Sequence, residues 1–144
     1  MTEAKPQKAF PRKDEDGRVI SFAEFLASAL ASTVVGLVIL VGIDALFSLA
    51  HVGSFGSISG WLAGILMVFG FVEDFRAWKG VTGRVVVTAL GVVVGVILGS
   101  LVNAVASDLP NAFSGAIAVA VAGVIYATMW FFGIRFCATR FGER

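Results

Sequence analysis

The sequence predicts an all-α integral membrane protein in which four transmembrane helices form a bundle. Of its 144 residues, 58% are hydrophobic and 15% are charged, and the mean hydropathy is +0.91. An ordinary soluble domain has about 25% charged and about 45–50% apolar residues, so both values depart toward the composition of a membrane protein. Four spans of about 20 residues each need about 80 residues. The length therefore leaves room for short connections and one tail, but not for a second domain.

Residues 1–21 are predicted to be a flexible, charged cytoplasmic tail, because they are rich in charged side chains and proline and have little to bury. The transmembrane domain then covers residues 22–144. Ser21 and Glu24 have the spacing of a capping box, in which each side chain accepts a hydrogen bond from the backbone N–H of the other residue. This pattern indicates a helix start. The first span follows over residues 25–49 and contains one charged residue, Asp44.

The second span is predicted over residues 58–79. Its uninterrupted apolar part ends at Val72 and is short for a hydrocarbon core of about 30 Å. Trp61 and Trp78, however, lie 17 positions apart, which is about 25 Å along a helix and close to the separation of two interfacial belts. Gly80 is typical of the residue that follows a helix, so we expect the span to end just before it.

The third span is predicted over residues 85–105 and the fourth over residues 115–136. The segment Asp108-Leu109-Pro110-Asn111 between them is typical of a turn.

Small residues recur at four-residue steps in these spans, so they share one face of each helix. In lipid, helices associate through close backbone packing and polar contacts, and small residues permit that approach. The face of the third span is predicted either to pack within the bundle or to line an oligomer seam or a pore. The predicted helix-packing residues are Ser28, Ser32, Gly36, Gly60, Gly64, Gly91, Gly95, Gly99, Asn103 and Gly123.

All eleven Lys and Arg residues fall in three segments: the tail, residues 76–84 and residues 135–144. The connections over residues 50–57 and 106–114 have none. Four spans place the three basic segments on one side of the membrane, which the positive-inside rule makes the cytoplasmic side, whereas three spans would separate them. We therefore expect both termini in the cytoplasm, and a bacterial plasma membrane as the location.

Ionisable residues near or within the spans are the candidates for function, since a charge inside a membrane is costly. Asp44 and His51, at the outer side of the first span, could form a site where a proton or cation enters, or could simply be polar residues at the outer boundary of the membrane. At the inner boundary the alternatives are a transport gate, or a structural cluster that ties the second span to the fourth. The candidate polar or ion-path residues are Asp44 and His51 at the outer side, and Glu73, Asp74, Arg76 and Arg135 at the inner side.

The sequence has no motif of catalysis. It has one His, one Cys and one Tyr, and no HExxH, CxxC, GxGxxG or phosphate-binding loop. The sole cysteine, Cys137, has no partner for an intramolecular disulfide. We therefore expect no enzyme, no cofactor and no bound metal.

Val35-Gly36 followed by Asp44, together with Phe136 and Arg140 in a Phe-x-x-x-Arg pattern, resembles the GtrA-like polyprenyl-phosphate sugar translocases. The resemblance implies a lipid-linked sugar translocase. That family has an Asn-Arg-aromatic signature at the cytoplasmic end of its second span, where this chain has Glu73-Asp74-Phe75-Arg76-Ala77-Trp78. We assign no family on this resemblance.

The sequence as a whole favours a small non-enzymatic membrane protein that acts through helix–helix assembly, with itself or as an accessory or structural subunit of a larger complex. The alternative is a small oligomeric transporter or channel for an ion or small solute, including a GtrA-like translocase. The expected partners are the lipid bilayer and other membrane helices. The net charge of +1 gives no reason to expect nucleic acid.

Overall fold

The computed structural model describes residues 10–50 and 72–142. Throughout these residues the chain is helical apart from turns and one isolated β-bridge, which confirms the predicted fold class for this part of the molecule. The helices are α1 (Phe22–Leu49), α3 (Val72–Ala77), α4 (Arg84–Val105) and α5 (Asn111–Phe141).

Three of these helices are long and apolar enough to cross a membrane, namely Phe22–Ile43 within α1, all of α4, and Phe113–Phe141 within α5. Their mean hydropathies are 2.4, 2.7 and 2.1. The expected second span falls mainly on residues 51–71, outside the described residues, and α3 is its last part. The span over residues 58–79, and with it the bundle of four transmembrane helices, therefore stays a prediction.

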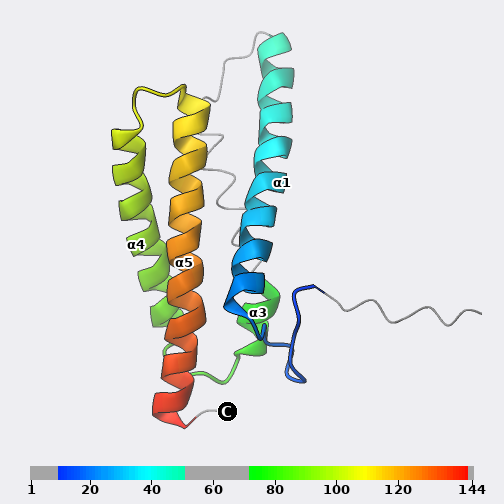
Figure 1. Ribbon diagram of the computed structural model, residues 1–144, viewed down its shortest axis with the longest axis vertical. Helices are drawn as coiled ribbons and strands as arrows, with labels where there is room; N and C mark the ends of the chain where they lie inside the picture. Colours follow the sequence, from blue (N-terminus) through cyan, green and yellow to red (C-terminus); the bar gives the residue numbers. More distant parts are fainter. Residues whose placement is uncertain (1–9, 51–71, 143–144) are drawn as a thin grey trace, which may run out of the picture.

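Helix α5 lies between its neighbours, with α4 on one side and the first half of α1 on the other (Figure 1). The glycine face of α4 is turned toward α5. A Cβ atom on Gly95 would lie 2.9 Å from the carbonyl oxygen of Ala122, and one on Gly91 would lie 3.2 Å from the Tyr126 ring. Gly99 is buried on the same face. The side chain that glycine lacks is what allows the two backbones to approach this closely.

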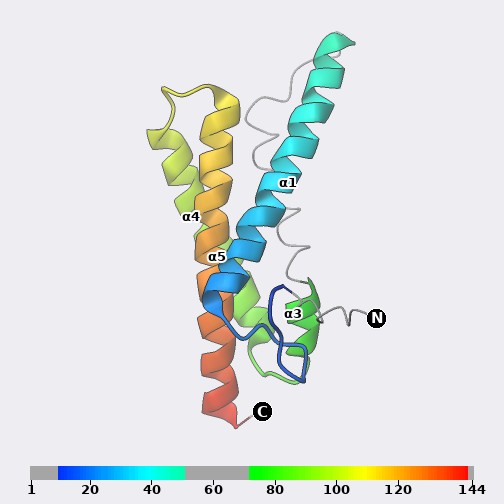
Figure 2. The same cartoon turned by 45° about the vertical axis from the view of Figure 1, so that its right-hand side comes forward.

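Helix α1 meets α5 through its first turns and then leans away from it (Figure 2). The Phe22 and Phe25 rings lie 5.3 and 5.6 Å from the Phe131 ring, and Ala29 and Thr33 are also buried. Beyond Thr33, most large apolar side chains of α1 are exposed.

The residues before α1 differ from the expected flexible tail, because residues 10–20 form a hydrogen-bonded turn. The Asp14 carboxylate accepts hydrogen bonds from the backbone N–H groups of Asp16 (3.1 Å) and Arg18 (2.7 Å), and Gly17 has a positive φ of 82°. Side-chain bonds of this kind and glycine in a left-handed conformation both favour a turn. Val19 at the end of the turn is 3% exposed, so the segment gains a buried anchor.

The predicted capping box is wrong. Ser21 is the N-cap residue of α1, but its side chain makes no capping hydrogen bond. The Glu24 carboxylate instead accepts from the backbone N–H of Arg12 (2.7 Å) and from Arg12 Nε (2.6 Å). The turn brings Arg12 to Glu24, and a charge-assisted bond is stronger than a bond to a neutral amide.

The span expected over residues 85–105 falls on α4, and the one expected over residues 115–136 lies within α5, which begins at Asn111 and ends at Phe141. Gly142 follows α5 with a φ of 68°, the left-handed conformation that ends many helices. Helix α3 ends at Ala77, two residues before the end at Lys79 that the sequence predicts.

Candidate functional site

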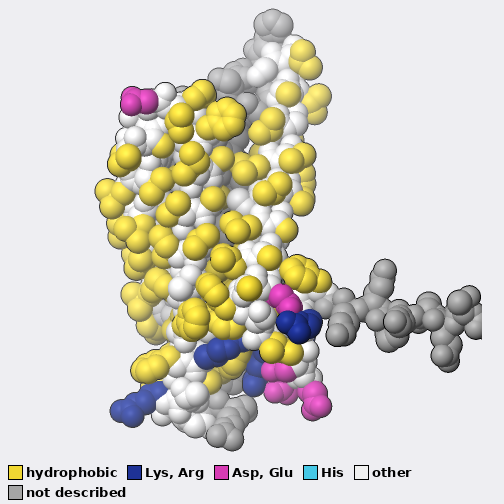
Figure 3. Space-filling view, in the orientation of Figure 1, with side chains coloured by type: hydrophobic (Ala, Val, Ile, Leu, Met, Phe, Trp, Pro, Cys, Tyr) yellow, Lys and Arg dark blue, Asp and Glu magenta, His cyan; other side chains and the backbone are white. Residues whose placement is uncertain are grey.

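Basic side chains gather at one end of the molecule, which we call the basic end. On the face shown in Figure 3, Lys and Arg lie around the start of α1, α3 and the end of α5, and apolar side chains cover the helices above. Asp108, between α4 and α5, is an exposed charged residue at the opposite end. The separation of charge from apolar surface is the pattern expected of helices that leave a membrane at the basic end.

Asp74 of α3 is the central buried charge of the basic end and is only 3% exposed. Its Oδ2 accepts a hydrogen bond from Trp130 Nε1 of α5 (2.8 Å), and its Oδ1 accepts one from the backbone N–H of Val19 (3.1 Å). The next residue of α3, Phe75, stacks on the Trp130 ring at 5.2 Å. These contacts join α3 to both α5 and the N-terminal turn.

Arg135 of α5 lies on the other side of Val19. Its guanidinium donates to the carbonyl oxygen of Val19 and to that of Phe131 (3.0 Å), and it lies 3.4 Å from the centre of the Phe131 ring. Val19 therefore binds Asp74 through its N–H and Arg135 through its C=O. Asp74 and Arg135 are thus joined through the backbone of Val19 and not by a direct ion pair.

Trp78 completes this group and is 6% exposed. Its ring lies 4.3 Å from the guanidinium carbon of Arg18 and 5.3 Å from that of Arg135, distances at which cation–π attraction operates. Within the described residues, Trp78 Nε1 and Arg18 Nε are buried and make no hydrogen bond. We refer to Arg18, Val19, Asp74, Trp78, Trp130 and Arg135 together as the inner cluster.

Of the candidates at the inner boundary, the structure brings Asp74 and Arg135 into one cluster and leaves Arg76 exposed outside it. The side chains of Glu73 and Asp44 lie outside the described residues, as does His51. Asn103 lies toward the opposite end of α4, where its Oδ1 is buried and makes no hydrogen bond to any described residue. It is therefore not part of the inner cluster.

Some of the predicted packing residues lie within the described part of the chain and others outside it. Gly60 and Gly64 lie outside the described residues. On α1, the Ser32 hydroxyl donates to the carbonyl oxygen of Ser28 in its own helix (2.9 Å), and Gly36 is buried. Gly123 of α5 is buried.

The sequence does not indicate Val19, Trp130 or Arg18 as site residues. Val19 is an ordinary apolar residue of a charged segment, and it acts through its backbone. Trp130 is of a residue type that is enriched at membrane interfaces, and its indole N–H can donate to a buried carboxylate. That signal could have indicated Trp130, but only the packing of α3 on α5 selects Asp74 as its acceptor.

The chemistry of the inner cluster is that of a tether. Each oxygen of the Asp74 carboxylate accepts a hydrogen bond from the protein, and the group is buried. No set of three or more His, Cys, Asp or Glu residues in the described ranges has a geometry that could hold a metal ion.

Comparison with protein-family models, curated proteins and solved structures finds no match for this chain. The class of the protein therefore rests on its own fold. Three long apolar helices with a basic end are compatible with a small integral membrane protein.

Proposed function

We propose that this protein is a small, non-enzymatic, multi-pass membrane protein that acts through helix–helix assembly, as an accessory or structural subunit of a membrane complex. The observation that carries the proposal is the way in which Asp74 is held. Both carboxylate oxygens bind donors of the protein itself, and the side chain is 3% exposed.

A carboxylate that carries an ion or proton across a membrane has to be reached from water. Asp74 instead links α3, α5 and the N-terminal turn, which is the role of a structural tether. The tether fixes the basic end, so the remaining helix surfaces are presented in a defined arrangement. This favours an assembly role over the transporter or channel alternative.

The outer half of α1 is the surface that suits assembly. Val38 and Leu46 are 68% and 67% exposed, and no atom of a described residue lies within 4 Å of the position that a Cβ on Gly42 would take. An exposed glycine in an apolar helix permits close approach of a second membrane helix. The glycine face of α4 is used within the chain, so the face around Gly42 is the better candidate.

The basic end supports a cytoplasmic location for both termini. The start of α1 and the end of α5 lie together there, and the far end of α1 lies at the opposite end of the molecule from α3 (Figure 1). The span expected over residues 58–79 would cross the membrane between these two points, so it requires the end of α1 and α3 to lie at opposite ends of the molecule. By the positive-inside rule the basic end faces the cytoplasm.

The test is the mass of the assembly. Full-length protein is extracted in a mild detergent and its mass is measured by light scattering, with the detergent contribution subtracted. We expect a defined species larger than the 15.1 kDa chain, and a shift toward the single chain for Gly42→Leu. Val93→Leu on the exposed face of α4 is the matched control and should keep the wild-type mass.

A transporter gives a different result. Ion or solute flux into proteoliposomes that is lost in a folded Asp74→Asn variant would support the alternative. A single-chain mass in several mild detergents, unchanged by Gly42→Leu, would contradict assembly through α1.

A further inference from the structure

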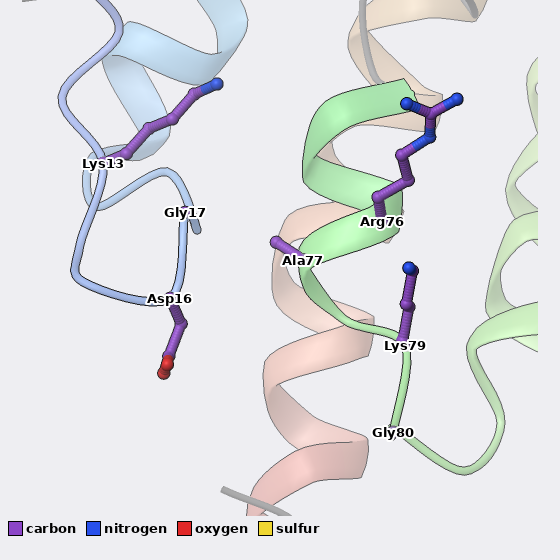
Figure 4. A pocket seen from close by; sticks show the side chains of 7 residues that line it. All are labelled: Lys13, Asp16, Gly17, Arg76, Ala77, Lys79 and Gly80. Atoms are coloured by element: carbon purple, nitrogen blue, oxygen red, sulfur yellow. The ribbon is translucent and has the colours of Figure 1, made fainter.

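An open pocket of about 500 Å³ lies at the basic end, between the N-terminal turn and α3. One wall is formed by Lys13, Asp16 and Gly17 of the turn (Figure 4). The other wall is formed by Arg76 and Ala77 of α3 and by Lys79 after it. The pocket is separate from the inner cluster, and none of the hydrogen bonds of Asp74 involves its lining residues.

The walls of the pocket are held in place by the inner cluster. A Cβ on Gly17 would lie 4.0 Å from the Ala77 Cβ, an ordinary contact distance. The residues that follow on each wall, Arg18 and Trp78, stack on each other at 4.3 Å. The two walls are therefore joined next to the pocket by a contact of the inner cluster.

The charge of the lining is strongly positive, with three cations against one carboxylate. Lys13, Arg76 and Lys79 point to the same side in Figure 4, and the Asp16 carboxylate points to the opposite side. Asp16 also forms an ion pair with Arg18 at 3.2 Å, so its charge is partly balanced. The lining therefore carries more positive than negative charge, as a site for an anion requires.

We infer that this pocket binds the phosphate group of an anionic phospholipid headgroup. It lies between α3 and the turn that precedes α1, at the end of the molecule where α1 begins and α5 ends (Figure 1), which is the level at which headgroups would meet the protein. Basic pockets next to membrane-spanning helices on the cytoplasmic side attract anionic lipids, and Lys and Arg pair well with phosphate oxygens. A soluble phosphate has the same chemistry, so the experiment separates the two sources.

The experiment titrates the full chain in detergent with phosphatidylglycerol or with phosphatidylcholine, and counts bound lipids by native mass spectrometry. We expect tighter binding of phosphatidylglycerol. Each pocket cation in contact with the bound headgroup should contribute roughly fivefold to this binding. The variant Arg76→Gln/Lys79→Gln should therefore bind phosphatidylglycerol about 25-fold more weakly, while its binding of phosphatidylcholine is unchanged.

The matched control is Arg140→Gln/Arg144→Gln, which removes the same two charges from the C-terminal end of the chain. It should keep the wild-type affinity. An equal loss in this control would overturn the inference, because it would show attraction to net charge rather than binding in the pocket. Equal binding of the two lipids by the wild-type chain would also overturn it.

Two further measurements complete the test. Inorganic phosphate at millimolar concentration should not displace phosphatidylglycerol, and displacement would show that the pocket takes soluble phosphate instead of lipid. Circular dichroism checks that each variant is folded. If the double variant is not folded, Lys13→Gln replaces it, with an expected loss of roughly fivefold, and an unchanged affinity in that variant overturns the inference.

Discussion

Asp74 is a buried carboxylate that two distant segments share. Val19 and Trp130 reach it from positions 55 and 56 residues away in the sequence. Removing a charge from water is costly unless hydrogen bonds replace the lost hydration, and bonds to an ionised acceptor are the stronger kind. The cost of burying Asp74 is thus offset by the donors that define where α3, α5 and the N-terminal turn meet.

The first prediction concerns the removal of this acceptor. Asp74→Ala leaves two buried donors, Trp130 Nε1 and the Val19 N–H, without a partner, and each such group costs about 1–3 kcal/mol. We expect a loss of about 2–6 kcal/mol in the free energy of unfolding, if the two costs add. Trp130→Phe keeps an aromatic ring against Phe75 and loses one bond, so it should cost less than Asp74→Ala.

The measurement is denaturant or SDS unfolding of the detergent-solubilised chain, followed by circular dichroism. Asp108→Ala at the opposite end is the control, because Asp108 is exposed. A stability of Asp74→Ala equal to that of this control would show that the carboxylate is not a tether.

The second prediction separates a direct ion pair from the arrangement around Val19. In a direct pair, the exchange Asp74→Arg with Arg135→Asp would restore part of the stability lost in each single variant. Here Asp74 faces N–H donors and Arg135 faces carbonyl oxygens, so the exchange would place a cation against donors and a carboxylate against acceptors. We expect the double variant to be no more stable than the worse single variant, as measured by the same unfolding assay.

At this scale the sequence predicts the charged residues and not their partners. Asp74 and Arg135 are conspicuous because they are charged residues at the edge of apolar segments. Their partners are backbone groups and an indole N–H, which every sequence offers in quantity. Only the approach of three segments decides which of them binds, and that approach follows from packing across more than fifty residues.

At the scale of elements, the contact between α4 and α5 depends on the absence of side chains. The Cβ that Gly95 lacks would meet a backbone oxygen, which cannot rotate away as a side chain does. At Gly91 the neighbour is the Tyr126 ring, which has some freedom to move. The two glycines therefore differ in how much a substitution should disturb the helix pair.

The third prediction is an order of stabilities. Gly95→Ala forces the helices apart and should destabilise the chain by about 1–3 kcal/mol, the usual cost of overpacking. Gly91→Ala should cost less. Gly42→Ala on α1 meets no atom of the described residues within 4 Å and should be neutral or stabilise by up to about 1 kcal/mol, since Ala favours a helix over Gly.

Thermal unfolding in one detergent, with the three variants measured side by side, tests this order. Equal stability of Gly95→Ala and Gly42→Ala would show that the contact between α4 and α5 does not need glycine.

Helices are the part of this fold that the sequence predicts well. An apolar segment of more than twenty residues has few other structures open to it, so α1, α4 and α5 follow from hydropathy alone. Their ends are less certain, because they depend on single residues such as Gly142. The composition of residues 1–21 as a whole predicts a flexible tail and does not indicate the N-terminal turn, although Asp14 and Gly17 carry a local turn signal.

At the scale of the whole molecule, the basic end organises the chain. The start of α1, α3, the start of α4 and the end of α5 meet there, and the connection between α4 and α5 lies at the opposite end (Figure 1). All described Lys and Arg residues belong to the segments that meet at the basic end. One orientation in the membrane would then place every described basic segment on the same side, so the expectation of a cytoplasmic basic end needs only the positions of Lys and Arg in the sequence.

The last prediction tests this orientation residue by residue. On a Cys137→Ala background, single cysteines replace Ala50, Lys79 or Asp108, which are all exposed. A membrane-impermeant maleimide applied to intact cells should label positions 50 and 108, because they lie beyond the outer ends of α1 and α4. Position 79 should react only after permeabilisation, because it lies at the basic end, which the positive-inside rule places in the cytoplasm. Labelling of position 79 in intact cells would contradict this orientation. If position 50 were labelled as well, it would also contradict the span expected over residues 58–79, since the chain would then stay on the outer side between α1 and α4.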